Sequence, residues 1–327
     1  MAMKVLVCGG AGYIGSHMVQ LLLDEGHEPV SLDNLSTGHA DAVGSSTLLV
    51  GDILDKEFLD KAFSDHGPFD LVMHFCAKSL VGESVLKPHL YYENNVTGTL
   101  QLLDAMRRFN HQRLVFSSTA ATYGVPKTEV IDESHPCAPV NPYGKTKLAI
   151  EQALKDYHAA YGIRSLSFRY FNACGAHPKA HIGERHDPET HLIPNVLKSL
   201  LDPDKPLKVF GNDYPTPDGS CIRDYIHVCD LADAHLAAAR WLEDNDTAGI
   251  MNLGNGDGFS VLEVIRATER VTGQIVAFDV EERRAGDPPR LVADAALARQ
   301  ELNWTPRFAS MDTIIETAWR FHKGFGA

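Results

Sequence analysis

A glycine-rich turn between a strand and a helix, near the start of the chain, constrains the fold more than any other feature. The apolar run at residues 4–8 predicts a buried parallel strand, which leads directly into the Gly-Gly-Ala-Gly-Tyr-Ile-Gly segment at 9–15. Apolar residues at helical spacing then predict a helix over 16–25, and a second apolar strand at 29–32 ends in Asp33. Strand, glycine turn, helix, strand and acid follow one another in the order of a dinucleotide-binding unit.

Each glycine of this turn has a physical role in such a unit. Gly9 permits the tight turn, Gly12 lets the backbone approach a pyrophosphate, and Gly15 lets the helix pack close to the sheet. Asp33 can accept hydrogen bonds from an adenosine ribose, and its charge would repel a 2′-phosphate. The turn therefore predicts a site for NAD rather than for NADP.

The first half of the chain continues to alternate predicted strands with predicted helices. A third strand closes at 51–53, and three further apolar runs predict strands at 69–75, 112–119 and 165–170. We therefore expect an α/β protein with a doubly wound parallel sheet, the NAD-binding Rossmann fold. Ligands of such a sheet bind at the carboxyl ends of its strands.

The character of the sequence changes after Phe171. Residues rich in His, Pro, Gly and Asp follow, without regular alternation until a helix begins at Leu192. We expect the NAD-binding domain to span 1–171 and to take back about 224–258, where a strand and an Ala-rich helix are predicted. A smaller C-terminal α/β substrate domain is expected over 172–327.

Composition and charge limit the classes of partner. The 327 residues include 43 acidic residues against 30 Lys and Arg, and the formal net charge of −13 would not attract nucleic acid or an anionic membrane surface. We find no apolar stretch of membrane-spanning length and no signal-peptide pattern. The six cysteines show no paired C-x-x-C spacing, so we expect free buried thiols and a cytoplasmic enzyme.

Tyr143 and Lys147 lie four residues apart in a predicted helix, which makes their side chains neighbours. An ammonium about 6 Å from a phenol contributes roughly 2.8 kcal/mol at an effective dielectric of about 20, so Lys147 should lower the phenol pKa by about two units. Tyr143 can then act as a base near neutral pH. Because such pairs are common on solvated helices, this interpretation depends on the neighbouring cofactor site and on the hydroxyl of Thr119.

The glycine turn with Asp33, the Tyr143 and Lys147 pair and the upstream Thr119 together resemble the extended short-chain dehydrogenase/reductase family, over nearly the whole chain. Within that family, more specific motifs resemble the UDP-sugar 4-epimerases, and these are residues 82–85, 169–172, 210–214, 223–228 and 283–287. The resemblance implies an NAD-dependent isomerase of galactose metabolism. It would interconvert UDP-glucose and UDP-galactose through a 4-ketosugar, with transient reduction of tightly held NAD. It also implies a homodimer.

The resemblance assigns roles residue by residue. Tyr143 would remove the C4 hydroxyl proton, Lys147 would also bond the nicotinamide ribose, and Thr119 would bond the same sugar oxygen, where the family usually has serine. The residues implied in cofactor binding are Gly9, Gly12, Tyr13, Ile14, Gly15, Asp33, Asn34, Leu35, Ser36, Thr37, Gly38, Asp52, Ile53, Phe75, Cys76, Ala77, Lys78, Asn94, Thr119, Tyr143, Lys147 and Phe171. Lysine-using relatives have that lysine one position after Lys78, where this chain has Ser79.

The residues implied in binding the UDP-sugar are Thr119, Tyr143, Asn172, His191, Leu192, Lys208, Val209, Phe210, Arg223, Arg284, Asp287 and Leu291. Among them, Arg223 and Arg284 resemble a diphosphate clamp, which suits the planar guanidinium group, and Asp287 would bond the uridine ribose. His191 stands where some relatives carry asparagine. Leu291 stands where some epimerases have a bulky tyrosine, so we expect some tolerance of UDP-N-acetylhexosamines.

A metal site is not expected. The histidines at 177, 181, 186 and 191 share no regular helical face, and Pro178, Gly183 and Pro188 interrupt them. A polar loop that covers the substrate is the simpler interpretation of this segment.

Rival functions fit the sequence less well. A nucleotide-sugar 4,6-dehydratase needs an acid pair beside its threonine, whereas Thr119 is followed by Ala120 and Ala121. A UDP-sugar decarboxylase, or an epimerase of UDP-uronates or UDP-pentoses, shares more of the pattern and stays open. A protein that senses NAD without catalysis would not need Tyr143, Lys147 and a hydroxyl at 119 together.

Overall fold

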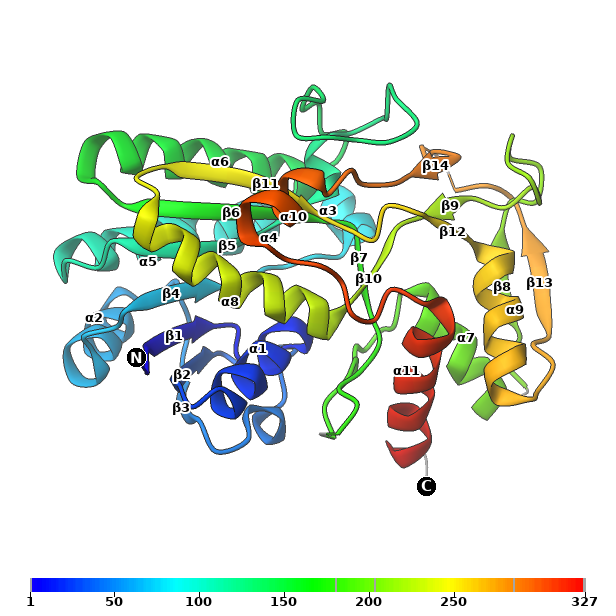
Figure 1. The fold of residues 1–327 in the computed structure, drawn as a ribbon, viewed down its shortest axis with the longest axis horizontal. Helices are drawn as coiled ribbons and strands as arrows, with labels where there is room; N and C mark the ends of the chain where they lie inside the picture. The colour runs from blue at the N-terminus through cyan, green and yellow to red at the C-terminus, as the bar shows by residue number, and fades with distance from the viewer. Residues whose placement is uncertain (1, 180, 203, 285, 326–327) are drawn as a thin grey trace.

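The centre of the computed structural model is a seven-stranded parallel sheet (Figure 1). The structure describes residues 2–179, 181–202, 204–284 and 286–325, so Ala285 of the 283–287 motif lies outside the described residues. The strand order is β11-β6-β5-β4-β1-β2-β3. These strands are β1 (Lys4–Cys8), β2 (Glu28–Asp33), β3 (Thr47–Val50), β4 (Leu71–His74), β5 (Arg113–Thr119), β6 (Arg164–Tyr170) and β11 (Ala248–Leu253). This order confirms the doubly wound sheet, whose direction of winding reverses between β1 and β4.

Helices cover both faces of the sheet because each presents an apolar stripe to it. One face packs against α1 (Tyr13–Asp24) and α8 (Val228–Asp244), through buried residues such as Met18 and Leu231. The other packs against α2 (Lys56–His66), α5 (Gly98–Arg108) and α6 (Pro142–Tyr161), through residues such as Leu102 and Ile150. Short turns η1 (Ala40–Val43), α3 (Val81–Leu86), α4 (Pro88–Tyr91), η2 (Tyr92–Thr97) and η3 (Ala120–Thr122) connect them.

The later part of the chain builds a smaller assembly beside the sheet, on the right in Figure 1. Its core contains Ile193, Val264 and Ile314, from α7 (Leu192–Leu201), α9 (Val261–Thr272) and α11 (Met311–Phe325). Its short strands are β7 (Asn172–Cys174), β8 (Leu207–Phe210), β9 (Ile222–Arg223), β10 (Tyr225–His227), β12 (Phe259–Ser260), β13 (Phe278–Glu281) and β14 (Arg290–Leu291). Helix α10 (Ala296–Leu302) follows β14 and packs on α8.

The strand predicted near 224–228 does not join the central sheet. It forms β10, which pairs with β7 in a separate two-stranded sheet. The chain returns to the central sheet through β11, which pairs with β6. Strand β11 begins with Ala248 and Gly249, and only a short apolar run follows them. The limits of the two predicted domains stay predictions.

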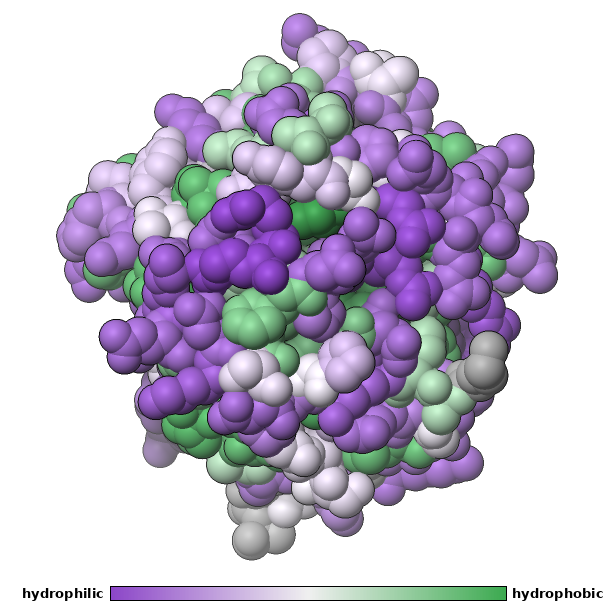
Figure 2. Space-filling view, turned by 90° about the vertical axis from the view of Figure 1, so that its left-hand side faces the viewer, coloured by the Kyte–Doolittle hydropathy of each residue, from purple (hydrophilic) through white to green (hydrophobic). Residues whose placement is uncertain are grey.

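The surface and the cysteines fit the composition. Figure 2 shows a face covered mainly by hydrophilic side chains, with small apolar areas among them. Of the helices in the described ranges, none combines the length and hydrophobicity that crossing a bilayer requires. All six cysteines are unpaired, as expected, but only Cys8, Cys174 and Cys221 are buried, while Cys76 and Cys229 are partly exposed and Cys137 is exposed.

Three buried histidines predict acid sensitivity. Burial lowers the pKa of His17 and His235 to about 4 and that of His227 to about 3. Below about pH 6.5 the unfolded chain binds protons at these positions while the folded chain does not, so the free energy of unfolding should fall as the pH falls. Each histidine adds a slope of up to about 1.4 kcal/mol per pH unit.

Urea unfolding between pH 7 and pH 4.5 measures this slope. His235→Phe should make it shallower, because the ring packs against Phe75 and Phe168 and carries a buried Nε2 without a hydrogen-bond partner among the described residues. His89→Gln, at an exposed position, is the control and should leave the slope unchanged. Equal slopes in the two variants would contradict the prediction.

Candidate active site

One large cavity of about 2070 Å³ lies at the carboxyl edge of the sheet, between it and the smaller assembly. Nearly all predicted cofactor and substrate residues line this cavity. The two exceptions are Leu35 and Gly38, which lie next to the Asp33 carboxylate. The Leu35 N–H donates to Asp33 Oδ1 at 2.8 Å, and a Cβ on Gly38 would lie 2.9 Å from that same oxygen. Lys78 and Ser79 both reach the cavity wall.

The glycine turn packs too closely against neighbouring backbone to accept a side chain at Gly9 or Gly15. Gly9 has a φ of 84°, and a Cβ there would lie 2.6 Å from the backbone nitrogen of Cys76. A Cβ on Gly15 would lie 2.0 Å from the Gly9 carbonyl oxygen. Helix α1 begins directly after Gly12 with no acidic residue in its first turn, so its N-terminal amides can meet an anion. With Asp33 on the wall, these residues fit a dinucleotide.

Local sequence places Tyr143 and Lys147 on the first turns of α6. The Asn141 side chain caps the helix by accepting the Gly144 N–H at 2.9 Å, and Pro142 occupies the first helical position. Lys147 is buried, and its Nζ donates to the Ser117 carbonyl oxygen at 2.7 Å while lying 6.0 Å from the Tyr143 ring centre.

The expected lowering of the Tyr143 pKa is absent from this structure. Burial raises the pKa of the phenol, and a hydrogen bond with Thr119 only partly opposes this. Lys147 points its ammonium at Ser117, and its own burial lowers its pKa to about 8. Desolvation therefore outweighs the neighbouring charge. Tyr143 needs a further positive charge in the cavity to become a base near neutral pH.

A buried ion pair lies behind the catalytic helix. Glu151, two turns beyond Tyr143, accepts two bonds from Arg169 on β6, at 2.9 Å and 2.5 Å, and a third from Ser118. Neither charged side chain is exposed by more than 4%. Although burial opposes the charge, Glu151 raises the pKa of Arg169. Tyr123 covers the guanidinium, with 4.7 Å between the Arg169 Cζ and the ring centre.

The opposite wall carries the predicted substrate residues. Arg284 lies over the Phe210 ring at 4.0 Å, and Arg223 forms a close ion pair with Asp287. The Asn172 amide donates to the Asp224 carbonyl oxygen at 2.7 Å. Strand β14 brings Leu291 beside Arg223 through its pairing with β9. Residues far apart in the sequence thus meet on one wall.

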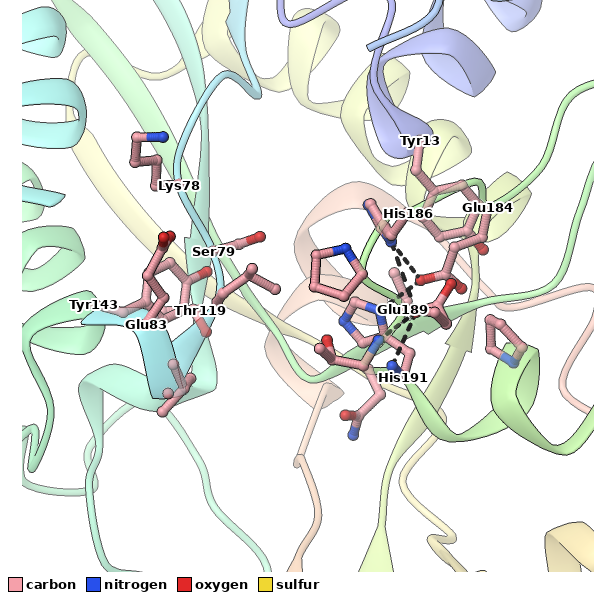
Figure 3. Close-up of a pocket in the computed structure, with 18 of the residues that line it drawn as sticks. Tyr13, Lys78, Ser79, Glu83, Thr119, Tyr143, Glu184, His186, Glu189 and His191 are labelled. Atoms are coloured by element: carbon pink, nitrogen blue, oxygen red, sulfur yellow. Dashed lines mark hydrogen bonds and ion pairs between the residues drawn. The ribbon is translucent and has the colours of Figure 1, made fainter. Parts of the chain in front are cut away.

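Glu184, His186 and Glu189 are among the polar residues of the cavity wall that were not predicted as site residues, and they gather with the predicted His191 (Figure 3). Although burial opposes it, hydrogen bonds from the two histidines lower the pKa of Glu184 to about 2. Burial likewise opposes the charge of His191, yet its two glutamate partners raise its pKa to about 10. No periodic pattern marks this set, because a loop assembles it.

Comparisons with known proteins agree with the geometry. The family model described as the NAD dependent epimerase/dehydratase family matches residues 5–254. A UDP-glucose 4-epimerase of Halalkalibacterium halodurans is 51% identical over 321 residues, 98% of this chain and 96% of the relative. A UDP-glucose 4-epimerase from Brucella ovis, solved in complex with NAD, has a TM-score of 0.94 at 49% identity, over 99% of each chain. The Stenotrophomonas maltophila enzyme, solved with NAD and formylated UDP-arabinopyranose, has a TM-score of 0.94 at 39% identity, over 99% of this chain and 98% of that one.

Proposed function

The chain belongs to the NAD dependent epimerase/dehydratase family, and we propose that it interconverts UDP-glucose and UDP-galactose by inverting the sugar C4 carbon. One observation carries the proposal. A single cavity joins the glycine turn to Tyr143, Lys147 and Thr119, and faces them with Arg223 and Arg284. The glycine turn suits a dinucleotide, the phenol of Tyr143 suits proton transfer with a sugar hydroxyl, and the two arginines suit a diphosphate.

The cofactor of this family is NAD, and the residues of the cavity would hold it in a defined way. The glycine turn and the first amides of α1 would receive the pyrophosphate, and Asp33 the adenosine ribose. When bound, NAD supplies the reversible oxidation of the sugar C4 carbon.

The chain's own residues move and hold the proton. Tyr143 Oη would take the proton from the C4 hydroxyl and later return it, while the Thr119 hydroxyl would orient the same oxygen. Thr119 is close enough to lower the phenol pKa, and both side chains line the same cavity. Tyr143 would gain from bound oxidised NAD the positive charge that it lacks in the free protein, and it would lose that charge when the cofactor is reduced, which would favour return of the proton.

The arginines would bind the diphosphate of the substrate. A guanidinium donates two parallel hydrogen bonds to an anionic edge, which a lysine ammonium cannot do. Because Asp287 pairs with Arg223 in the free protein, binding of the diphosphate would compete for that arginine. Asp287 would then be free to bond the uridine ribose.

We further propose a homodimer in the cytoplasm. Several apolar side chains near α3 and α5 are exposed, including Val85, Leu86, Tyr92 and Leu100, and the exposed fraction of Leu86 is 82%. Val85 and Leu86 also line the cavity, whereas Tyr92 and Leu100 are not among its lining residues. Exposed apolar side chains outside the cavity favour burial in an interface between two copies. Sedimentation of the purified protein measures the oligomeric state directly.

Incubation of the purified protein with UDP-galactose, without added NAD, tests the proposed function. The anomeric proton signals of UDP-glucose should appear in NMR spectra, because the cofactor is regenerated in each turnover. If supplying NAD still gives no conversion, the reaction is a different one on the same scaffold. A 4,6-dehydratase would instead give a 4-keto-6-deoxysugar from UDP-galactose. Parallel incubations with a UDP-uronate and a UDP-pentose would test for a decarboxylase or for an epimerase of those sugars.

Leu291 should set the range of sugars. It packs beside the small cluster of Ala120, Tyr123 and Ile131, next to the catalytic threonine. We expect epimerisation of UDP-N-acetylglucosamine, and Leu291→Tyr should lower its kcat/KM by about 10-fold to 200-fold more than that for UDP-galactose. Leu291→Met, which conserves volume, is the control. An equal loss for both substrates in Leu291→Tyr would contradict a role in pocket size.

A further inference from the structure

Four potential metal ligands converge on one point of the cavity wall. Glu184, His186, Glu189 and His191 each offer one atom, and these four atoms all lie within 4.8 Å of one another. Glu184 Oε1 lies 3.0 Å from Nδ1 of His186 and 2.6 Å from Nδ1 of His191, and Glu189 Oε1 lies 4.0 Å and 3.3 Å from the same nitrogens. Figure 3 shows these contacts converging opposite Tyr143 and Thr119.

These separations have the size of a metal coordination shell. Four ligand atoms at about 2.0–2.2 Å from a tetrahedral zinc ion lie about 3.3–3.6 Å from one another. The four printed separations scatter around that value, so small side-chain movements would complete a tetrahedron. Two imidazole nitrogens with two carboxylate oxygens favour zinc over magnesium or calcium, which prefer oxygen ligands alone.

Burial supplies an independent reason for a cation here. The side chains of Glu184 and Glu189 are both only 4% exposed. Two buried carboxylates this close repel each other, and in the free protein they pair with His191 and Lys198. Glu189 Oε2 is buried without a hydrogen-bond partner among the described residues, and its nearest cation is the Lys198 ammonium at 3.7 Å. A divalent ion would balance both carboxylates.

We propose that Glu184, His186, Glu189 and His191 form a structural zinc site that fixes the 184–191 loop on the wall of the cavity. Four protein ligands fill a tetrahedral shell, which leaves no open position for catalysis. The site would also connect the two sides of the cavity. The His186 ring meets Tyr13 of the glycine turn edge-on at 6.2 Å, and His191 directly precedes α7. The sequence analysis expected no metal because the histidines share no helical face, but a loop needs no helical periodicity to assemble ligands.

The test uses the full-length protein without a histidine tag, stripped with a chelator and then titrated with zinc in competition with a chromophoric chelator. We expect about one zinc per chain in the unaltered protein and in His181→Ala, whose exposed histidine lies in the same segment outside the cluster. His186→Ala should bind zinc on the order of 100-fold more weakly. Equal affinity in His186→Ala and His181→Ala would overturn the proposal, as would no zinc binding by the unaltered protein.

X-ray absorption on the zinc-loaded unaltered protein gives a second test that needs no variant. Two imidazoles and two oxygens at about 2.0–2.2 Å are expected, and a shell with fewer than two imidazoles would overturn the assignment. Neither readout depends on sugar-nucleotide turnover. Failure of the zinc site and failure of the proposed function are therefore distinguishable.

Discussion

Tyr143→Phe should lower kcat for UDP-galactose by about 10²-fold to 10⁴-fold, the usual contribution of a positioned proton-transfer group. The substitution removes only the phenol oxygen, and the ring remains against α6 and Thr119. The measurement is steady-state kinetics together with the NAD content of the purified variant.

The Tyr143→Phe variant should still contain bound NAD. The glycine turn and Asp33 are proposed to bind the cofactor away from the phenol oxygen, so the NAD content should match that of the unaltered protein. Tyr161→Phe is the matched control, because Tyr161 ends the same helix at an exposed position. If Tyr143→Phe turned over as fast as Tyr161→Phe, the proton would have to move through another group.

The cofactor half of the fold could be predicted because its signals are local. Gly15 is required by a contact within the turn itself, since a Cβ there would lie 2.0 Å from the Gly9 carbonyl oxygen, and Gly9 has a local φ of 84°. Most strands of the sheet could likewise be predicted from their apolar runs. Strand β11 escaped prediction because its first residues, Ala248 and Gly249, carry too little side chain to form such a run.

The electrostatics of the site could not be predicted from spacing. The four-residue spacing on α6 correctly predicted that Tyr143 and Lys147 are neighbours. The direction of the Lys147 ammonium, however, depends on the Ser117 carbonyl of strand β5, which the spacing does not reveal. Burial, which raises the phenol pKa, is a property of the whole cavity. The pairing of Arg223 with Asp287 and the gathering of Glu184 with His191 also depend on tertiary structure alone.

Arg169→Met should lower the free energy of unfolding by about 3–5 kcal/mol, because it leaves the Glu151 carboxylate buried without its partner. Urea unfolding at neutral pH with saturating NAD measures the change. The control is Arg270→Met, which breaks the ion pair with Asp312 on the surface and should change stability little. Glu151 also connects α6 to β5 and β6 through Ser118 and Arg169. Because α6 carries Tyr143 and Lys147, Arg169→Met should lower kcat as well as the free energy of unfolding.

Comparing the double variant Glu151→Leu with Arg169→Met against Arg169→Met alone distinguishes the effect of the unpaired charge from the effect of altered packing. If the cost arises from an uncompensated buried carboxylate, removing both charges should restore most of the lost stability, since apolar side chains of similar volume can replace a buried ion pair. Turnover should recover less than stability, because the helix that carries Tyr143 and Lys147 would lose its hydrogen-bonded tie to Ser118. A double variant as unstable as Arg169→Met would instead show that packing geometry, rather than charge pairing, fixes the catalytic helix.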